Sequence, residues 1–286
     1  MFEIIFKHYG DAANLKKYLE VESCQSWLHE TLFQQQKHYV VSIDQLDENV
    51  QSVVKQLAMF ILNSKRLDWA STILSEFYLY NDPHEQEQIL QIMIEMFNGE
   101  RPELVQLLKE WDEEQFLYQN LEGITESNGP VSFDSFVKFR LKKLEERTME
   151  YVDIAIDEYK MEQDYQMFIH MLREYLSSRE NQIDIIHLYF SSYGFTFYNE
   201  FFEELTREKL LTLIDKRLLT NHPLYVDSYT IAPLLSLAPE KILVYCDQPE
   251  SNLIRTIQNI FEERVQILPS CSFPLTIGGI SEAVNE

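Results

Sequence analysis

Acidic side chains and histidines at helical spacing are the residues of this sequence that could carry out proton transfer. Asp184 precedes His187 by three residues, which in a helix would let the carboxylate orient the imidazole. Glu158, Glu162 and His170 would share a helix neighbourhood in the same way. Either group could serve as a general acid or base. Such spacings also arise by chance, and we interpret them as interface histidines with carboxylate neighbours, with an enzyme as the alternative.

The familiar motifs of nucleotide, zinc and hydrolase sites are missing from the sequence. Its seven glycines form neither a phosphate-binding loop nor a GxGxxG turn. Its seven histidines show no HxxxH or HExxH spacing, and no cysteine stands at ligand spacing from one. No GxSxG is present. We therefore expect no cofactor and no metal, and a catalytic site would have to be assembled from distant segments.

A cluster of positive charge stands out in a chain whose formal net charge is -23. The segment SFDSFVKFRLKKLEER covers residues 132–147. If it is helical and Val137 faces the core, its basic residues form a stripe on an adjoining face, next to aromatic side chains. The stripe could be solvated or self-paired, could dock on the protein's own acidic segment, or could bind an external ligand. The candidate partner-binding residues are Phe136, Phe139, Arg140, Lys143 and Arg147.

The chain as a whole is strongly acidic, with 47 acidic against 24 basic residues. Residues 82–126 alone hold twelve acids and two bases. That segment could be a docking face for a basic partner, but we favour the solvated side of two helices. Excess negative charge repels phosphate backbones, so phosphate or nucleic-acid binding through the stripe at 138–147 is the weakest alternative.

The sequence predicts a cytoplasmic protein without membrane insertion. The opening residues MFEIIFKHYGD carry charge at Glu3 and Lys7 and do not follow the pattern of a signal peptide. No stretch reaches the roughly 18 uncharged apolar residues of a membrane span. The three cysteines, Cys24, Cys246 and Cys271, are far apart and lack a CxxC pair, which is typical of reduced thiols.

Local patterns predict an α+β fold that is predominantly α-helical. Strand-like segments at 2–6 and 38–44 enclose a helix-forming stretch, which indicates a small strand-helix-strand element over residues 1–45. Apolar residues at three- and four-residue spacing predict a central helical bundle over residues 46–205. Its helices are expected within 49–63, 67–80 and 85–99.

After the helical body, the sequence pattern changes from helical to mixed helix and strand. KILVYC, a helix opened by Pro249, and VQIL predict a parallel strand-helix-strand crossover in a C-terminal α/β element, residues 206–275. Residues 182–199, rich in aromatic side chains, could be helix or strand. Residues 276–286 are expected to be a flexible tail.

A long helix is predicted to begin at Phe133 after the N-cap candidate Ser132. Apolar residues at three- and four-residue spacing form one buried stripe as far as Tyr159. The next positions at the same spacing are Glu162 and Gln166. Either these two polar residues lie in a helix interface, or the helix bends or shifts its contact face near residue 160. We favour the second interpretation.

From this stretch onward the sequence resembles the YtxC-like family, described as sporulation proteins of endospore-forming bacteria. The most characteristic parts are Phe-Val-x-Phe-Arg-Leu at 136–141 and Glu-Tyr-x-x-Glu-x-x-Tyr at 158–165. QIDIIHLYF, APEKILVYC and IQNIFEERVQIL extend the resemblance over roughly residues 130–270. The resemblance implies a cytoplasmic protein of a spore-former acting in sporulation. It supplies no reaction, cofactor or catalytic residue.

These observations favour a non-enzymatic interaction or scaffold protein that binds another protein. The alternative is an enzyme whose polar site includes Glu158, Glu162, His170 and His187.

Overall fold

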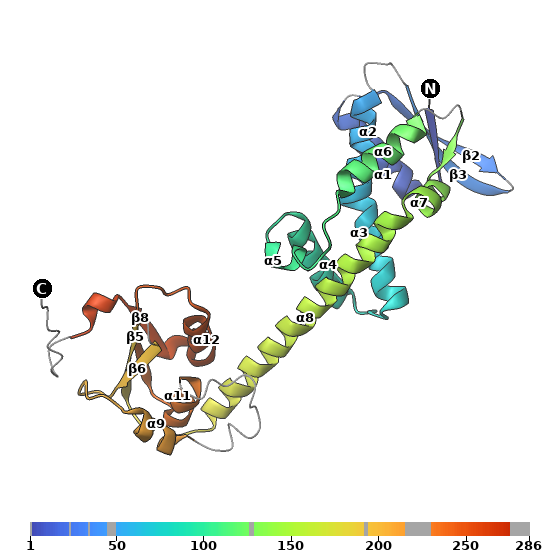
Figure 1. Ribbon diagram of the computed structural model, residues 1–286. Helices are drawn as coiled ribbons and strands as arrows, with labels where there is room; N and C mark the ends of the chain where they lie inside the picture. The colour runs from blue at the N-terminus through green and yellow to red at the C-terminus, as the bar shows by residue number, and fades with distance from the viewer. Residues whose placement is uncertain are drawn as a thin grey trace, which may run out of the picture. The chain divides into compact units, whose positions relative to one another are not determined.

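The computed structural model describes residues 2–22, 24–33, 35–44, 50–125, 129–191, 194–214 and 230–274 (Figure 1). The chain divides into two compact units, residues 1–161 and residues 162–286. Each unit has a small four-stranded sheet and its own helices. The fold is α+β and predominantly helical, as predicted.

The sheet of the first unit has the strand order β2-β3-β1-β4. β1 (Phe2–Phe6) pairs antiparallel with β3 (Gln36–Ile43) and parallel with the two-residue β4 (Val131–Ser132). β2 (Ser26–Phe33) pairs antiparallel with β3 and forms an edge of the sheet. α1 (Tyr9–Val21) buries Ala12, Leu15 and Leu19 in the core that it shares with β1 and β3.

β2 corrects the prediction that the stretch between the strand-like segments at 2–6 and 38–44 is helical throughout. The helix α1 ends at Val21, and the following residues pair with β3 over eight consecutive positions. Tryptophan, threonine and phenylalanine in SWLHETLF favour a strand once a neighbour offers its backbone groups. The partner strand therefore outweighs the local helix preference.

The first two helices expected in the body are joined without a turn. α2 (Val50–Phe60) continues through the π-helical segment η2 (Ile61–Lys65) into α3 (Arg66–Thr72) and a second π-helical segment, η3 (Ile73–Phe77). The breaks expected after residue 80 and at Asn98-Gly99 are present. α4 (Pro83–Phe97) begins at the N-cap Asp82, whose carboxylate accepts from the backbone N–H of His84 at 2.8 Å.

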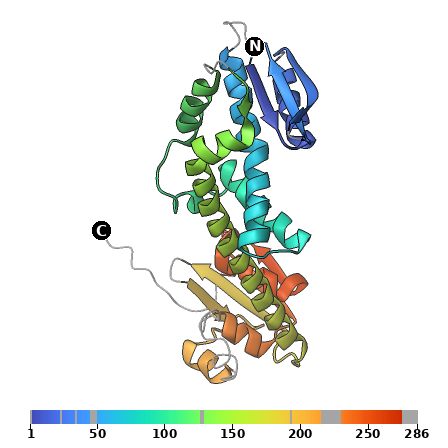
Figure 2. The ribbon, with the colours of Figure 1, turned by 90° about the vertical axis from the view of Figure 1, so that its right-hand side faces the viewer.

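The first unit also contains α5 (Pro102–Val105), α6 (Glu113–Thr125), α7 (Phe133–Arg140) and the beginning of α8 (Lys142–Ser177). α2, α6 and α7 pack with the sheet in one apolar core. α3, α4 and α8 lie side by side (Figures 1 and 2), and a second core joins them through Ala70, Met93 and Val152. The acidic segment is thus held against α8 by apolar contacts.

α7 and α8 correct the prediction of one unbroken helix from residue 133. The N-cap is Ser132 as predicted, but the helix is interrupted at Leu141 and restarts at Lys142. Near residue 160 the helix continues without a break, and Glu162 and Gln166 are both exposed. The interpretation that they lie in a buried interface is wrong.

The second unit is built on a mixed sheet of order β6-β5-β7-β8. β5 (Ile185–Ser191) and β6 (Gly194–Tyr198) pair antiparallel, so the strand alternative holds for these two parts of the aromatic-rich stretch at 182–199. β7 (Lys241–Tyr245) pairs parallel with both β5 and β8 (Val265–Leu268). α12 (Asn252–Phe261) lies between β7 and β8 in sequence, which confirms the predicted strand-helix-strand order. The helix is not opened by Pro249, because Ser251 is the N-cap and its hydroxyl accepts from the backbone N–H of Ile254.

In the described residues of this unit, the other helices are α9 (Arg207–Leu213), α11 (Ile231–Leu237) and the short 3-10 segments η4 (Glu262–Arg264) and η5 (Ser270–Ser272). One apolar core unites the end of α8, the sheet, α11 and α12. The expected flexible tail at 276–286 lies outside the described residues. Within the described ranges, no helix is both long and apolar enough to cross a bilayer.

Candidate functional site

The interruption at Leu141 creates the corner at which the basic residues are presented. Leu141 itself is buried and is the last residue of the α7 hydrogen-bond ladder, donating its N–H to the carbonyl of Val137 at 3.0 Å. Its own carbonyl accepts from the backbone N–H groups of Leu144 and Glu145 in the first turn of α8. Burial of Phe133, Val137 and Leu144 fixes both helices against the core. The polar residues between them are left facing solvent.

Two of the five candidate contact residues are buried. Phe136 is 5% exposed and packs in the core of the first unit. Arg147 is 8% exposed, and its guanidinium donates to Glu113 at 2.9 Å, to Glu150 at 2.8 Å and to the carbonyl of Lys109 at 2.9 Å. These internal contacts give Arg147 a structural role in the first unit.

Lys143 also contacts the first turn of α6 and the residues just before it. Its ammonium lies 4.3 Å from the centre of the Trp111 ring and 5.8 Å from that of Phe116. A cation over an aromatic face is attracted by the ring electrons. Arg147 and Lys143 therefore bind the stretch 109–116 of this protein, which is part of the acidic segment at 82–126.

Four neighbouring side chains remain available on the surface, and we name them the basic corner. Phe139 is 75% exposed, and the Lys138 ammonium lies 5.8 Å from the centre of its ring. Lys142 is exposed and pairs with Glu146 at 3.6 Å, one turn along α8. In the part of the chain that the structure describes, neither Lys138 nor Arg140 has an ion pair within 4 Å. The basic corner consists of Lys138, Phe139, Arg140 and Lys142.

The four residues of the alternative polar site have unrelated surroundings. Glu158 accepts from Arg101 at 2.9 Å, and Arg101 also contacts Glu95 at 2.6 Å, so Glu158 belongs to an ion-pair network of the first unit. Glu162 is exposed, and His170 is exposed and lies 3.4 Å from Glu174. None of these three residues lines a pocket that the structure describes, so none is placed in a cavity as a general acid or base.

His187 is buried in the second unit, in β5. Its Nδ1 lies 3.0 Å from the hydroxyl of Tyr245 in β7, and its ring packs on Phe202 with a centroid distance of 4.1 Å. Asp184 is exposed at the start of the strand, so the helical spacing to His187 does not apply. Burial lowers the pKa of His187, which favours the neutral imidazole.

The second unit should therefore lose stability on acidification. Because the pKa of His187 is lower in the folded state than in the unfolded chain, the unfolded chain binds the proton more readily. The contribution is fully present above the unfolded pKa of about 6.5 and is lost as pH falls from that value through the lower pKa of the folded state. We expect the free energy of unfolding of this unit to be lower at pH 5.5 than at pH 7.5. Urea unfolding monitored by hydrogen exchange of β5 and β7 would measure this difference.

A histidine substitution tests the origin of this pH dependence. His187→Gln should reduce it, whereas His170→Gln, which alters an exposed histidine of the same unit, should leave it unchanged. The same pH dependence in His187→Gln and in the wild type would assign it to another group.

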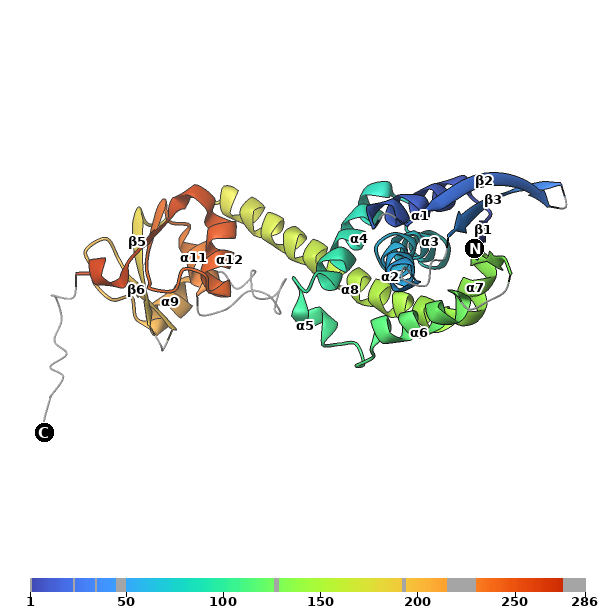
Figure 3. The same cartoon turned by 90° about the horizontal axis from the view of Figure 1, so that it is seen from above.

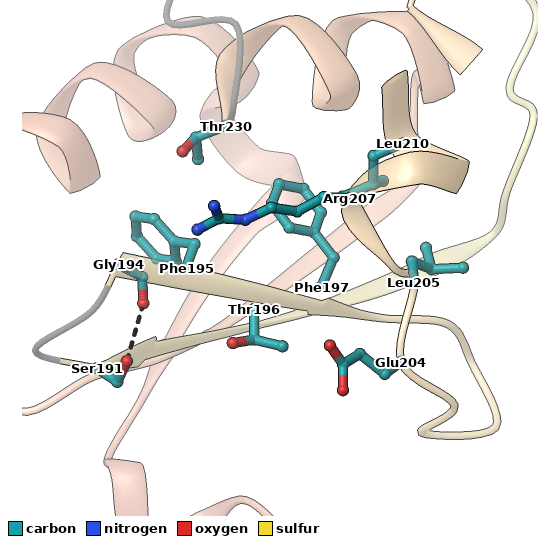
Figure 4. Close-up of a pocket in the computed structure, with 10 residues that line it drawn as sticks. All are labelled: Ser191, Gly194, Phe195, Thr196, Phe197, Glu204, Leu205, Arg207, Leu210 and Thr230. Carbon is teal, nitrogen blue, oxygen red and sulfur yellow. Dashed lines mark hydrogen bonds between the residues drawn. The ribbon is translucent and has the colours of Figure 1, made fainter. Parts of the chain in front are cut away.

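Sequence reasoning did not find the pocket beside β6 (Figure 4). It has a volume of about 480 Å³, and Arg207 extends from α9 across it toward Phe195. Ser191 donates to the carbonyl of Gly194 at 3.2 Å along its rim. The ten lining residues that the structure describes include neither histidine nor cysteine, so they hold no Ser-His or Cys-His pair. The only hint in the sequence is the density of Thr, Ser and Phe around Gly194.

Comparison with known proteins identifies relatives of the chain. The profile of the YtxC-like family matches residues 51–266. The chain is 37% identical over 217 residues to a Bacillus subtilis (strain 168) protein described as "Uncharacterized protein YtxC", and the match covers 76% of each chain. No solved structure gives a significant match.

Proposed function

The chain belongs to the YtxC-like family, and we propose that it is a non-enzymatic interaction protein whose basic corner binds an acidic surface of another protein. The proposed setting is the cytoplasm of a spore-forming cell during sporulation, following the description of the family. The free thiols Cys24, Cys246 and Cys271 agree with a reducing compartment.

The exposure of Phe139 among cations is the observation that carries this proposal. A phenylalanine that is 75% exposed gains by burial against a partner. Arginine and aromatic residues are also enriched among the residues that dominate binding energy. Arg140 and Lys138 lie beside Phe139 in sequence, so a partner that covers the ring also meets their charge. An acidic partner surface provides both contacts.

Charge steering should make this association sensitive to salt. The basic corner is a local exception in a chain of net charge -23, so the partner's acids must be close to it to be attracted. Nucleic acid would meet the same cations but also the repulsion of the surrounding carboxylates. The acidity of the chain favours a protein partner.

The decisive experiment is to crosslink the protein in sporulating cells and to compare the partners that are recovered with the wild type and with its variants. Arg140→Glu with Lys142→Glu reverses the basic corner, and Phe139→Ala removes its ring. Lys17→Glu with Lys55→Glu is the matched control, because it makes the same charge change at exposed positions of α1 and α2. Arg147 is left intact, since its substitution would disturb the ion pairs with Glu113 and Glu150.

We expect a specific protein to be recovered by the wild type and by the control, and to be lost or reduced at least about tenfold in both corner variants. Far-UV circular dichroism should show that all variants are folded. Equal recovery by wild type and corner variants would contradict the proposal. Recovery that disappears after nuclease treatment would assign the corner to nucleic acid.

A further inference from the structure

β2 is an edge strand that lacks the usual protection against pairing with another strand. It runs for eight residues at the outside of its sheet, and within the described ranges no strand pairs with its outer edge (Figure 3). Every residue from Ser26 to Phe33 has a partner in β3, so no bulge twists the strand away. It contains neither proline nor lysine. Alternate residues of such a strand turn free N–H and C=O groups outward.

The side chains along this edge are unusually apolar for exposed positions. Trp27 is 51% exposed, Leu32 71% and Phe33 63%. Its only acidic residue, Glu30, is held by Lys37 of the neighbouring strand at 2.8 Å. An edge with free backbone groups and large apolar side chains is a template for another strand.

We propose that the β2 edge binds the β2 edge of a second copy of this chain, as an antiparallel pair centred on Glu30. The two-fold axis of such a dimer is perpendicular to the sheet, so two residues that face each other project from the same side of the sheet. Side chains alternate between the two sides along a strand, so the residue numbers of a facing pair are both even or both odd. Centring on Glu30 places Trp27 opposite Phe33 and Leu28 opposite Leu32, each pair occurring twice.

The register is the reason for proposing a second copy of this chain as the partner of β2, and not an unrelated strand. Facing pairs of aromatic or aliphatic residues are the units that stabilise antiparallel sheets. A shift of the centre to His29 would place Trp27 opposite Thr31 and Leu28 opposite the carboxylate of Glu30, so the apolar matches would be lost. The sequence of β2 is therefore self-complementary in one register.

Electrostatics opposes this dimer in two ways that can be measured. The two Glu30 side chains face each other at the centre, where like charges repel, although each has Lys37 beside it. Each chain also carries a net charge of -23, which repels a second copy at low ionic strength. The dimer should therefore be tighter in higher salt, in contrast to the charge-driven contact of the basic corner.

Sedimentation velocity over about 1–100 µM protein tests the association. We expect the wild type to shift toward dimer with concentration, and Trp27→Thr to raise the dissociation constant at least about tenfold, because it removes both aromatic pairs. Glu30→Gln should lower the constant several-fold. Phe77→Thr is the control, since it removes another exposed aromatic residue of the same unit.

Crosslinking tests the register itself. In a Cys271→Ser background, which removes the exposed native thiol, Glu30→Cys should oxidise to a linked dimer because the axis places residue 30 opposite itself. Gln36→Cys, an exposed position in β3, should not. A monomer throughout the concentration range, or a dimer unaffected by Trp27→Thr, would overturn the proposal.

Discussion

Replacing Glu113 by glutamine should lower the free energy of unfolding of the first unit by about 3 kcal/mol. Glu113 is the shared anion of two buried guanidinium groups: its carboxylate lies 2.7 Å from Arg66 and 2.9 Å from Arg147. The Arg66 side chain is only 5% exposed, and its guanidinium lies 4.4 Å from the centre of the Phe97 ring. Burial lowers the pKa of Arg66, and Glu113 opposes that shift. Without the carboxylate, both cations remain buried with less compensation.

All three tryptophans belong to the first unit, so their fluorescence during urea unfolding follows this change. Glu114→Gln is the control, because it removes the same charge from an exposed neighbour. Combining Glu113→Gln with Arg66→Met should cost less than the sum of the single substitutions, since the unpaired cation is then absent. An effect of Glu113→Gln as small as that of Glu114→Gln would contradict this account.

Phe273→Ala should destabilise the second unit by about 3 kcal/mol. Phe273 follows η5 and is buried among the aromatic side chains of the sheet. Its ring centre lies 4.9 Å from that of Tyr198, 5.0 Å from those of Tyr189 and Tyr245, and 5.8 Å from that of Phe202. Truncation removes all four contacts and leaves a cavity.

The loss should be confined to the second unit. Hydrogen exchange of β5, β7 and β8 should accelerate, while the tryptophan-monitored transition of the first unit stays in place. Cys271→Ala changes an exposed residue of the same segment and should have little effect. Unchanged exchange in Phe273→Ala would show that the ring contributes little to the stability of the sheet.

Much of the local structure follows from neighbouring residues. Ser132 and Asp82 cap helices because their side chains accept from backbone N–H groups two or three residues away. KILVYC and VQIL are strands because short apolar runs bounded by turn residues suit a buried parallel sheet. Family membership is also legible in the sequence, although the profile match begins at residue 51, well before the resemblance at residues 130–270.

The candidate site was predicted less completely, because its composition depends on distant contacts. The spacing of Arg140, Lys143 and Arg147 is helical, but their exposure is decided by what packs against them. Glu113 precedes Arg147 by 34 residues in sequence, and no local pattern indicates that their side chains meet. The basic corner therefore differs from the predicted set of contact residues. It includes Lys138 and Lys142, and it leaves out Phe136 and Arg147.

The sequence by itself determined the helix and strand character of most segments, the helix caps, the acidic charge and the family, because these depend on residues close together in the chain. The tertiary structure decided β2, the interruption at Leu141 and the surroundings of His187 and Arg147. A strand needs a partner strand, a buried cation needs a carboxylate, and a buried imidazole needs the hydroxyl of Tyr245. Each partner comes from a different segment of the chain, so its position is fixed only when the unit has folded.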